Sequence, residues 1–224
     1  MCGRFVMITD LSTIIDVFGI EHVSGDVRPS YNIAPGSTVA AVINDGATRL
    51  VNFRWGLVPS WSRDPAIGAR LINARGETVA EKPSFRAAFK QRRCLIIANG
   101  FYEWQRRTTG KTPMYISLKG EIPFGFAGLF ETWRSPEGEK LRTCTIITTD
   151  ANELIRPIHD RMPVIIPAGQ VPRWLDPSMA DTTRLVSLLV PYPECEMTAY
   201  AVSPLVNSPR HDSPECTTPA AARM

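Results

Sequence analysis

The middle of the chain is a series of short β-type segments, and this series limits the possible folds more than any other feature. Five segments are rich in branched and aromatic residues: 93–98, 101–106, 113–118, 124–130 and 142–148. Turn sequences such as Thr109-Gly110-Lys111 and Pro136-Glu137-Gly138 separate some of them. The spacing predicts consecutive antiparallel strands and leaves no room for the alternating helices of a Rossmann or TIM-barrel layout.

Local signals predict the elements around this series. Asp45-Gly46 between apolar runs is a strong turn signal and predicts a hairpin of strands 38–43 and 48–55. Asp10 is a good helix N-cap and Gly19 a good C′ residue, so a helix is expected between them. Other helices are predicted at 83–91, 151–155, 168–175 and 180–190, and a last strand at 196–202. Together these elements predict an α+β fold with a mostly antiparallel, barrel-like β-sheet core and peripheral helices.

The chain length of 224 residues suits one large domain with a real core, which we place at residues 2–207. After Ser208 the chain is rich in proline and small polar residues, which predicts a disordered tail over residues 208–224. No apolar run reaches the roughly 18 residues that a membrane helix needs. The first residues lack the pattern of a secretory signal, so a cytoplasmic protein is expected.

Cysteine and histidine spacing gives no sign of a metal site. The five cysteines lie at positions 2, 94, 144, 195 and 216 without a Cys-x-x-Cys pair, and the 3 histidines are scattered. We therefore expect no disulfide framework, no metal and no cofactor. Cys94 and Cys144 lie in apolar runs and are predicted to be inert core residues.

The net charge of +3 conceals an uneven distribution. Residues 1–110 carry 14 basic and 9 acidic side chains, whereas residues 111–224 carry 11 and 13. Arginine supplies 20 of the 25 basic residues, which suits phosphate contacts, although genomic composition bias would produce the same excess. Residues 49–107, which we call the basic region, carry 12 basic and 4 acidic side chains, and their net charge of +8 indicates an anionic partner.

Cys2 becomes the N-terminal residue if the initiator methionine is removed. It then carries an α-amine and a thiol on adjacent carbons. Because the pKa of an α-amine is about 7.7–8.0, roughly a quarter of it is neutral and nucleophilic near physiological pH. Such a 1,2-aminothiol condenses with an aldehyde, first to an imine and then to a five-membered thiazolidine. The alternative is that Cys2 is simply the second residue and has no such role.

Four polar residues lie in contexts that suit either structure or chemistry. Glu103 lies among aromatic residues of a predicted strand, where it either faces solvent or acts as an acid with a raised pKa. His159 lies beside an aspartate that could orient it, although a lone histidine is more often structural. Asn73 and Arg75 are two residues apart on an extended segment, so they point to one side.

Six short motifs occur in one order along nearly the whole chain. They are Met-Cys-Gly-Arg-Phe at the start, Tyr-Asn-Ile-Ala-Pro-Gly at 31–36, Arg-Trp-Gly-Leu-Val-Pro at 54–59, Ile-Asn-Ala-Arg-Gly-Glu-Thr at 72–78, Asn-Gly-Phe-Tyr-Glu-Trp at 99–104 and Ile-His-Asp-Arg-Met-Pro at 158–163. The set resembles the SOS-response-associated peptidase (SRAP) domain family, which shields abasic sites, over about residues 2–207.

The resemblance implies an activity and the residues that perform it. Family members remove their own initiator methionine, and the exposed Cys2 forms a thiazolidine with the ring-opened aldehyde of an abasic site in single-stranded DNA. This crosslink protects the lesion from strand cleavage, and AP-lyase-like activity is a further expectation. The implied catalytic residues are Cys2, Asn73, Glu103 and His159, and the implied DNA-binding residues are Arg4, Pro35, Arg75, Trp104, Thr148 and Arg161.

Two departures from the family pattern concern the grip on DNA. Ser60 precedes Trp61 where some members have paired tryptophans, and the segment 82–84 lacks an arginine that some members carry.

Two other functions also stay open. Cys2 with His159 would suit a thiol peptidase acting on other proteins, and the basic region alone would suit a passive single-stranded DNA-binding protein. For the main hypothesis we expect a monomer that is associated with DNA and not with membranes.

Overall fold

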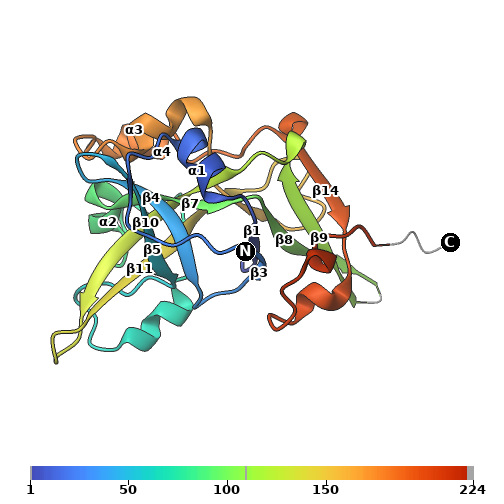
Figure 1. Cartoon of the computed structure of the whole chain (residues 1–224), viewed down its shortest axis with the longest axis horizontal. Helices are drawn as coiled ribbons and strands as arrows, with labels where there is room; N and C mark the ends of the chain where they lie inside the picture. The colour runs from blue at the N-terminus through green and yellow to red at the C-terminus, as the bar shows by residue number, and fades with distance from the viewer. Residues whose placement is uncertain (1, 109, 221–224) are drawn as a thin grey trace.

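The computed structural model describes residues 2–108 and 110–220. Its strands form two sheets that lie side by side along the long axis of the molecule (Figure 1). One sheet closes into a barrel, and the other is an open sheet of five strands. The predicted α+β fold with a barrel-like core is confirmed.

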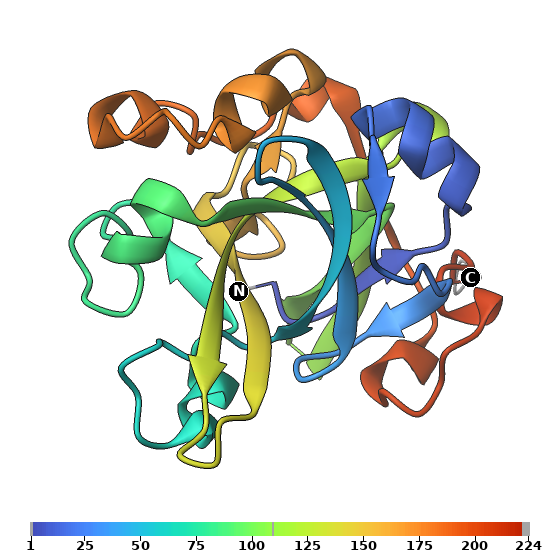
Figure 2. The ribbon, with the colours of Figure 1, turned by 60° about the vertical axis from the view of Figure 1, so that its left-hand side comes forward.

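The barrel is a ring in which each strand pairs with two neighbours. Its strands are β4 (Thr38–Asn44), β5 (Thr48–Trp55), β7 (Arg93–Ala98), β10 (Phe124–Arg134) and β11 (Lys140–Asp150). Antiparallel pairing runs from β5 through β4, β7 and β10 to β11. A parallel pairing of Cys144 with Trp55 then joins β11 to β5 and closes the ring (Figure 2).

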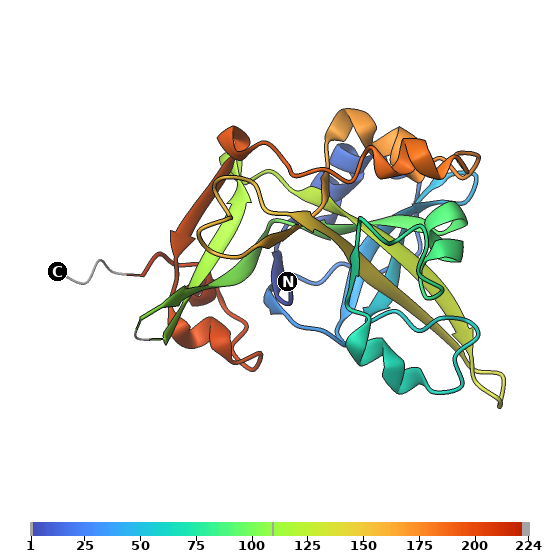
Figure 3. The same ribbon diagram turned by 180° about the vertical axis from the view of Figure 1, so that it is seen from behind.

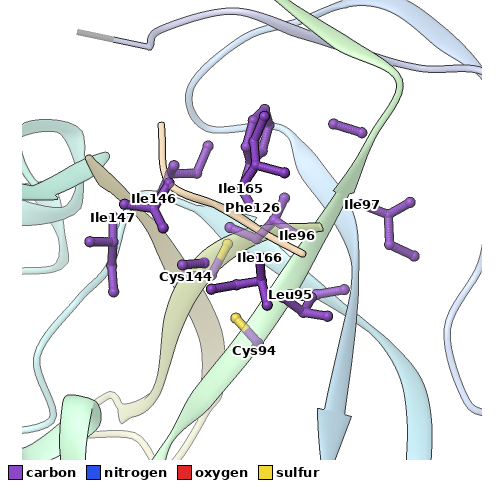
Figure 4. Packing of buried hydrophobic residues seen from close by; sticks show 14 of the residues in the cluster. Cys94, Leu95, Ile96, Ile97, Phe126, Cys144, Ile146, Ile147, Ile165 and Ile166 are labelled. Carbon is purple, nitrogen blue, oxygen red and sulfur yellow. The ribbon is translucent and has the colours of Figure 1, made fainter. Parts of the chain in front are cut away.

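Apolar side chains of these strands form the core of the molecule (Figure 4). Leu95, Phe126 and Ile146 have no exposed surface. Cys94 and Cys144 lie in the same cluster and are also completely buried, which confirms that they are core residues. Burial raises the pKa of both thiols, so both stay protonated.

The second sheet has the strand order β14, β9, β8, β1, β3. The bounds are β14 (Met197–Ala201), β9 (Gly110–Leu118), β8 (Gly100–Arg107), β1 (Phe5–Met7) and β3 (Ser30–Ile33). Asn99 lies where the chain passes from the barrel to β8, and its buried side-chain oxygen accepts from the backbone N–H groups of Ile8 and Thr9. These bonds fix the end of β1 at the junction of the two sheets, in the middle of the molecule (Figure 1).

The helices are short and peripheral. Helix α1 (Leu11–Phe18) has Asp10 as its N-cap and Gly19 at φ +60° as its C-cap, as predicted. Helix α2 (Arg86–Gln91) packs on β7 and β10. Helices α3 (Val171–Leu175) and α4 (Thr182–Val186) lie along the same side of the barrel as α1 (Figure 3). All except α1 are shorter than predicted.

The predicted helix at 151–155 is wrong, because this segment forms turns. The side-chain oxygen of Asn152 accepts from the N–H of Ile155 at 3.0 Å, which competes with a helical backbone bond, and Pro157 cannot continue a helix. The remaining elements are small. They are β2 (His22–Val23), β6 (Asn73–Arg75), β12 (Arg161–Pro163), β13 (Ile165–Ile166) and the 3₁₀ turns η1 (Pro65–Arg70), η2 (Lys119–Glu121), η3 (Ala168–Gln170), η4 (Glu194–Glu196), η5 (Pro204–Asn207) and η6 (Pro214–Cys216).

The C-terminal segment differs from the sequence-based expectation. Residues 208–220 follow a defined path, so the predicted disorder is wrong for them, while residues 221–224 lie outside the described residues. The physical reason is that Cys216 is buried and that the buried Asn32 amide donates to the carbonyls of Ser208 and His211. Composition does not reveal such long-range partners. Within the described part of the chain, no helix is both long and apolar enough to cross a membrane.

Candidate active site

Cys2 lies just before β1 and has no exposed surface. The side-chain amide of Asn73 donates to the carbonyl oxygen of Cys2 at 2.8 Å. Asn73 belongs to β6, which pairs in parallel with β11 opposite Ile146. A residue attached to the barrel therefore holds the first residues of the chain in place. The Oδ1 atom of Asn73 is buried and has no hydrogen-bond partner among the described residues, so it can accept a further bond.

Glu103 lies on β8 of the second sheet and is 3% exposed, so it does not face solvent. Burial raises the pKa of this carboxyl, and the nearby charge of His159 partly opposes the shift. Burial likewise raises the pKa of the Cys2 thiol, and the negative charge of Glu103 adds to that effect. Glu103 therefore lies close to both Cys2 and His159, and the three side chains belong to one site.

His159 lies directly before β12 and is mainly buried. Its Nδ1 atom accepts the backbone N–H of Arg161 at 3.0 Å, and the same atom lies 2.8 Å from a carboxylate oxygen of Asp160. The first contact requires a lone pair on Nδ1, whereas the second is favourable when Nδ1 carries a proton. The Asp160 side chain is 86% exposed, so solvent weakens the second contact.

The predicted residues on the second sheet form a connected group. Nη1 of Arg4 donates to the side-chain oxygen of Asn32 at 2.6 Å and to the carbonyl oxygen of Val206 at 2.8 Å. The Arg4 guanidinium lies 5.9 Å from the ring centroid of Trp104. The indole N–H of Trp104 donates in turn to the side-chain oxygen of Asn207 at 2.7 Å. The structure thus brings Arg4 and Trp104 together.

The predicted residues on the barrel side have different partners. Arg161 makes a two-pronged contact with the carboxylate of Glu77 at 2.6 and 2.9 Å, and its Nη1 also lies 2.8 Å from Asp150. Its Nη2 further donates to the carbonyl oxygen of Thr148, a residue with no exposed surface. Arg75 is exposed and pairs in register with Thr148.

Pro35 is exposed in the turn between β3 and β4. It borders a pocket of about 370 Å³ that Arg54, Trp55 and Ala66 also line. Trp61, on the loop after β5, is 61% exposed. The tryptophan that remains where some family members have two is thus accessible.

Sequence reasoning missed four residues that support the site: Asn32, Glu77, Asp150 and Asn207. Glu77 belongs to the motif at 72–78, so its proximity to Arg75 was a usable signal. Asn32 also lies in a motif, at 31–36, but nothing local shows that its amide holds a segment more than 170 residues away. Asn207 and Asp150 carried no signal at all. Among the described residues, no group of three or more His, Cys, Asp or Glu could hold a metal ion.

The chain is similar in sequence to a known protein family and to named members of it. Residues 1–209 match the family model described as SOS response associated peptidase (SRAP). The chain is 50% identical to abasic site processing protein YoqW of Bacillus subtilis over 219 residues, covering 96% of this chain and 98% of that protein. It is 36% identical to abasic site processing protein HMCES of Gallus gallus over 228 residues, covering 87% of this chain and 67% of that protein.

A solved structure agrees with these sequence matches. The crystal structure of a protein from Bacteroides thetaiotaomicron superposes with a TM-score of 0.88 at 29% identity, covering 98% of this chain and 100% of that one. The match extends over both sheets and the site between them. The chain therefore belongs to the SOS response associated peptidase (SRAP) family.

Proposed function

We propose that this protein recognises abasic sites in single-stranded DNA and captures them covalently through Cys2 after removal of Met1. The observation that carries the proposal is the placement of Cys2, which is buried beside Glu103 and held through its carbonyl by Asn73. A second residue without a role needs no such environment. The relatives named as abasic site processing proteins support the choice of lesion.

The capture reaction balances without any cofactor. The neutral α-amine of Cys2 attacks the C1′ aldehyde of the ring-opened sugar and gives a carbinolamine. Loss of one water leaves an imine, and the Cys2 sulfur then adds to the imine carbon. The thiol proton passes to the nitrogen, so the product is a thiazolidine with new C–N and C–S bonds and one water released.

The neighbouring side chains suit these steps. The free Oδ1 of Asn73 can orient the amine. Because burial raises the pKa of Glu103, its carboxyl can donate a proton as water leaves the carbinolamine and take one back as the thiol adds. The thiol needs this base, since its own pKa is raised well above the usual value. His159 can protonate the sugar oxygen as the ring opens.

The DNA contacts follow from exposed arginine and aromatic side chains. Arg75 and Trp61 are exposed, and Arg4 lies against Trp104 beside the site. Arginine contacts to phosphate carry no sequence information, and stacking accepts every base, so this grip suits a lesion at any position in a single strand. We propose that Pro35 and Arg161 complete this surface, that the buried Thr148 contributes by holding the Arg161 guanidinium through its carbonyl oxygen, and that the protein acts as a monomer.

The deciding experiment uses single-stranded DNA with one abasic site and a denaturing gel. The wild type should give a heat-resistant shifted band, and its intact mass should lack Met1. Cys2→Ala should give no band. Cys2→Ser is the matched variant, because it keeps the amine but loses the thiol, and it should give a lasting band only after reduction of the imine.

The other two functions are separate outcomes of the same assay. Binding of the wild type without a lasting band would favour a passive single-stranded DNA-binding protein. Cleavage of peptides by the wild type without a DNA adduct would favour a thiol peptidase that uses Cys2 and His159. Retention of Met1 on the purified protein would contradict the proposal, because the reactive amine would then be absent.

A further inference from the structure

The last described residues form a strap over the second sheet, which we define as residues 203–220. The strap follows β14, contains the 3₁₀ turns η5 and η6, and contacts β9 and β3 (Figure 3). The match to the family model ends at residue 209, so much of the strap lies beyond it. Its position beside Arg4 and Trp104 raises the question of what it contributes to the site.

The strap first fixes Arg4 through Asn32. The Asn32 side chain is 3% exposed, and its amide nitrogen faces three strap carbonyls, those of Val206 at 3.3 Å, Ser208 at 3.0 Å and His211 at 2.6 Å. Its oxygen accepts from Nη1 of Arg4, which also donates to Val206. The direction of the Arg4 guanidinium therefore depends on the strap and on a buried amide that the strap orients.

The strap also fixes Trp104 through Asn207. A partly exposed tryptophan on a strand can rotate unless its indole N–H has a partner. Here that partner is the side-chain oxygen of Asn207, at 2.7 Å. The same ring lies 5.9 Å from the Arg4 guanidinium, so both contacts restrict one pair of side chains.

The strap is itself well anchored. Val206 and Cys216 have no exposed surface and pack in one apolar cluster with Tyr102, the neighbour of Glu103. Asp212 accepts the backbone N–H of Tyr31, and Ala220 donates to Ala201. A segment anchored in this way can hold two side chains in a fixed geometry at little entropic cost upon DNA binding.

We propose that the strap pre-organises Arg4 and Trp104 for single-stranded DNA, with Asn207 as the positioning residue that sets the Trp104 ring. The inference rests on the proposed function, because it concerns how tightly lesion DNA is held. It assigns Asn207 a role in binding and none in the covalent step.

The test is the rate of crosslinking as a function of DNA concentration. Asn207→Ala should raise the DNA concentration for half-maximal rate about five-fold, the effect of one lost hydrogen bond, and leave the rate at saturating DNA unchanged. Thr218→Ala is the matched control, since Thr218 is exposed on the same strap and its hydroxyl donates to the carbonyl oxygen of Pro214, which also belongs to the strap. This control should behave as the wild type.

A second variant separates positioning from general damage. Trp104→Phe keeps a ring but removes the indole N–H, so Asn207→Ala should have no further effect in that background. An equal effect of Asn207→Ala in both backgrounds would overturn the proposal, as would an unchanged half-maximal concentration in the single variant. A fall in the saturating rate would assign Asn207 to the chemistry instead. Failure of the wild type to crosslink at all would overturn the proposed function itself, so the two failures are distinguishable.

Discussion

The two sides of the site hold their arginines in opposite electrostatic environments. On the second sheet, Arg4 is bound by the amide oxygen of Asn32 and the carbonyl oxygen of Val206, which carry no charge. On the barrel, Arg161 is bound by two carboxylates, Glu77 and Asp150. These partners therefore leave the positive charge of Arg4 uncompensated, whereas Arg161 together with Glu77 and Asp150 carries a net negative charge.

Arginines at two positions of the family motifs therefore lie in environments that suit two different purposes. The Arg4 side offers charge with a fixed direction, which suits a phosphate contact. The Arg161 side joins β12, the loop after β6 and the end of β11, and its backbone N–H orients His159. If the Arg4 side mainly binds DNA and the Arg161 side mainly holds the site residues in place, variants on the two sides should change different measured properties.

The largest effect is expected at Glu103, which lies where the two sides meet. Glu103→Gln keeps the shape of the side chain but cannot shuttle protons, so the crosslinking rate should fall about 100-fold or more. Binding of undamaged single-stranded DNA should stay near the wild-type value. Both quantities can be measured, by gel and by fluorescence anisotropy. An equal loss in both would argue against the acid–base role.

The next largest effect is expected for Arg161→Gln, which should lower the stability of the folded protein. It leaves Glu77 and Asp150 without their cation, and the Arg161 side chain is only 13% exposed, so the free energy of unfolding should fall by about 1–2 kcal/mol. Arg75→Gln is the matched control, because Arg75 lies on β6, which also pairs with β11, and it should change the free energy of unfolding by less than about 0.5 kcal/mol. Denaturant unfolding measures both. Equal values would show that the carboxylate contacts add nothing.

The pH dependence of stability should change in Glu103→Gln. Because burial raises the pKa of Glu103, the folded wild type binds this proton more tightly than the unfolded chain does. The stabilisation of the fold by this proton is complete below the pKa of Glu103 in the unfolded chain. It is lost as the pH rises through the pKa of Glu103 in the folded protein. The neutral amide has no such loss, so the variant should gain stability relative to the wild type as the pH rises above about 4, the unfolded pKa of a glutamate.

Urea unfolding at increasing pH checks the sign. Glu139→Gln, at an exposed turn, is the control and should follow the wild type at every pH. A variant that lost stability relative to the wild type as pH rose would contradict the burial of the Glu103 carboxyl.

The smallest expected effect is on the salt dependence of the affinity for DNA. If Arg4 contacts a phosphate, Arg4→Gln should reduce the slope of log affinity against log salt by about 0.7 for a single strand. Arg161→Gln should reduce it less, because two carboxylates already surround that guanidinium. Anisotropy titrations at several salt concentrations measure the slopes. A larger change for Arg161 would reverse the assignment of the two sides.

Sequence reasoning succeeded where a signal is local. The Asp10 cap and the Gly19 stop specify α1 by contacts within a few residues. The Asp45-Gly46 turn specifies the hairpin of β4 and β5 for the same reason. Sequence reasoning failed at 151–155, where the pattern predicts a helix but the chain forms turns and the side-chain oxygen of Asn152 accepts the N–H of Ile155.

The site shows the same division. Motifs named Cys2, Asn73, Glu103 and His159, but their partners were visible only in three dimensions. The position of Glu103 on a predicted strand left both a solvent-facing and a buried side chain open, and only the folded structure shows that it is buried. The carboxylates around Arg161 and the bond from Trp104 to Asn207 join residues that are 84, 11 and 103 positions apart.

The capped helix α1, the hairpin of β4 and β5 and the candidate site residues could be predicted from the sequence, because they depend on neighbouring residues and on short motifs. The division of the strands between two sheets, the closure of the barrel by β11 and β5, the burial of Cys2 and the path of the strap are visible only in the folded structure. Each of these joins segments distant in sequence, and their pairing depends on which apolar surfaces and buried polar groups satisfy one another once the whole chain is folded.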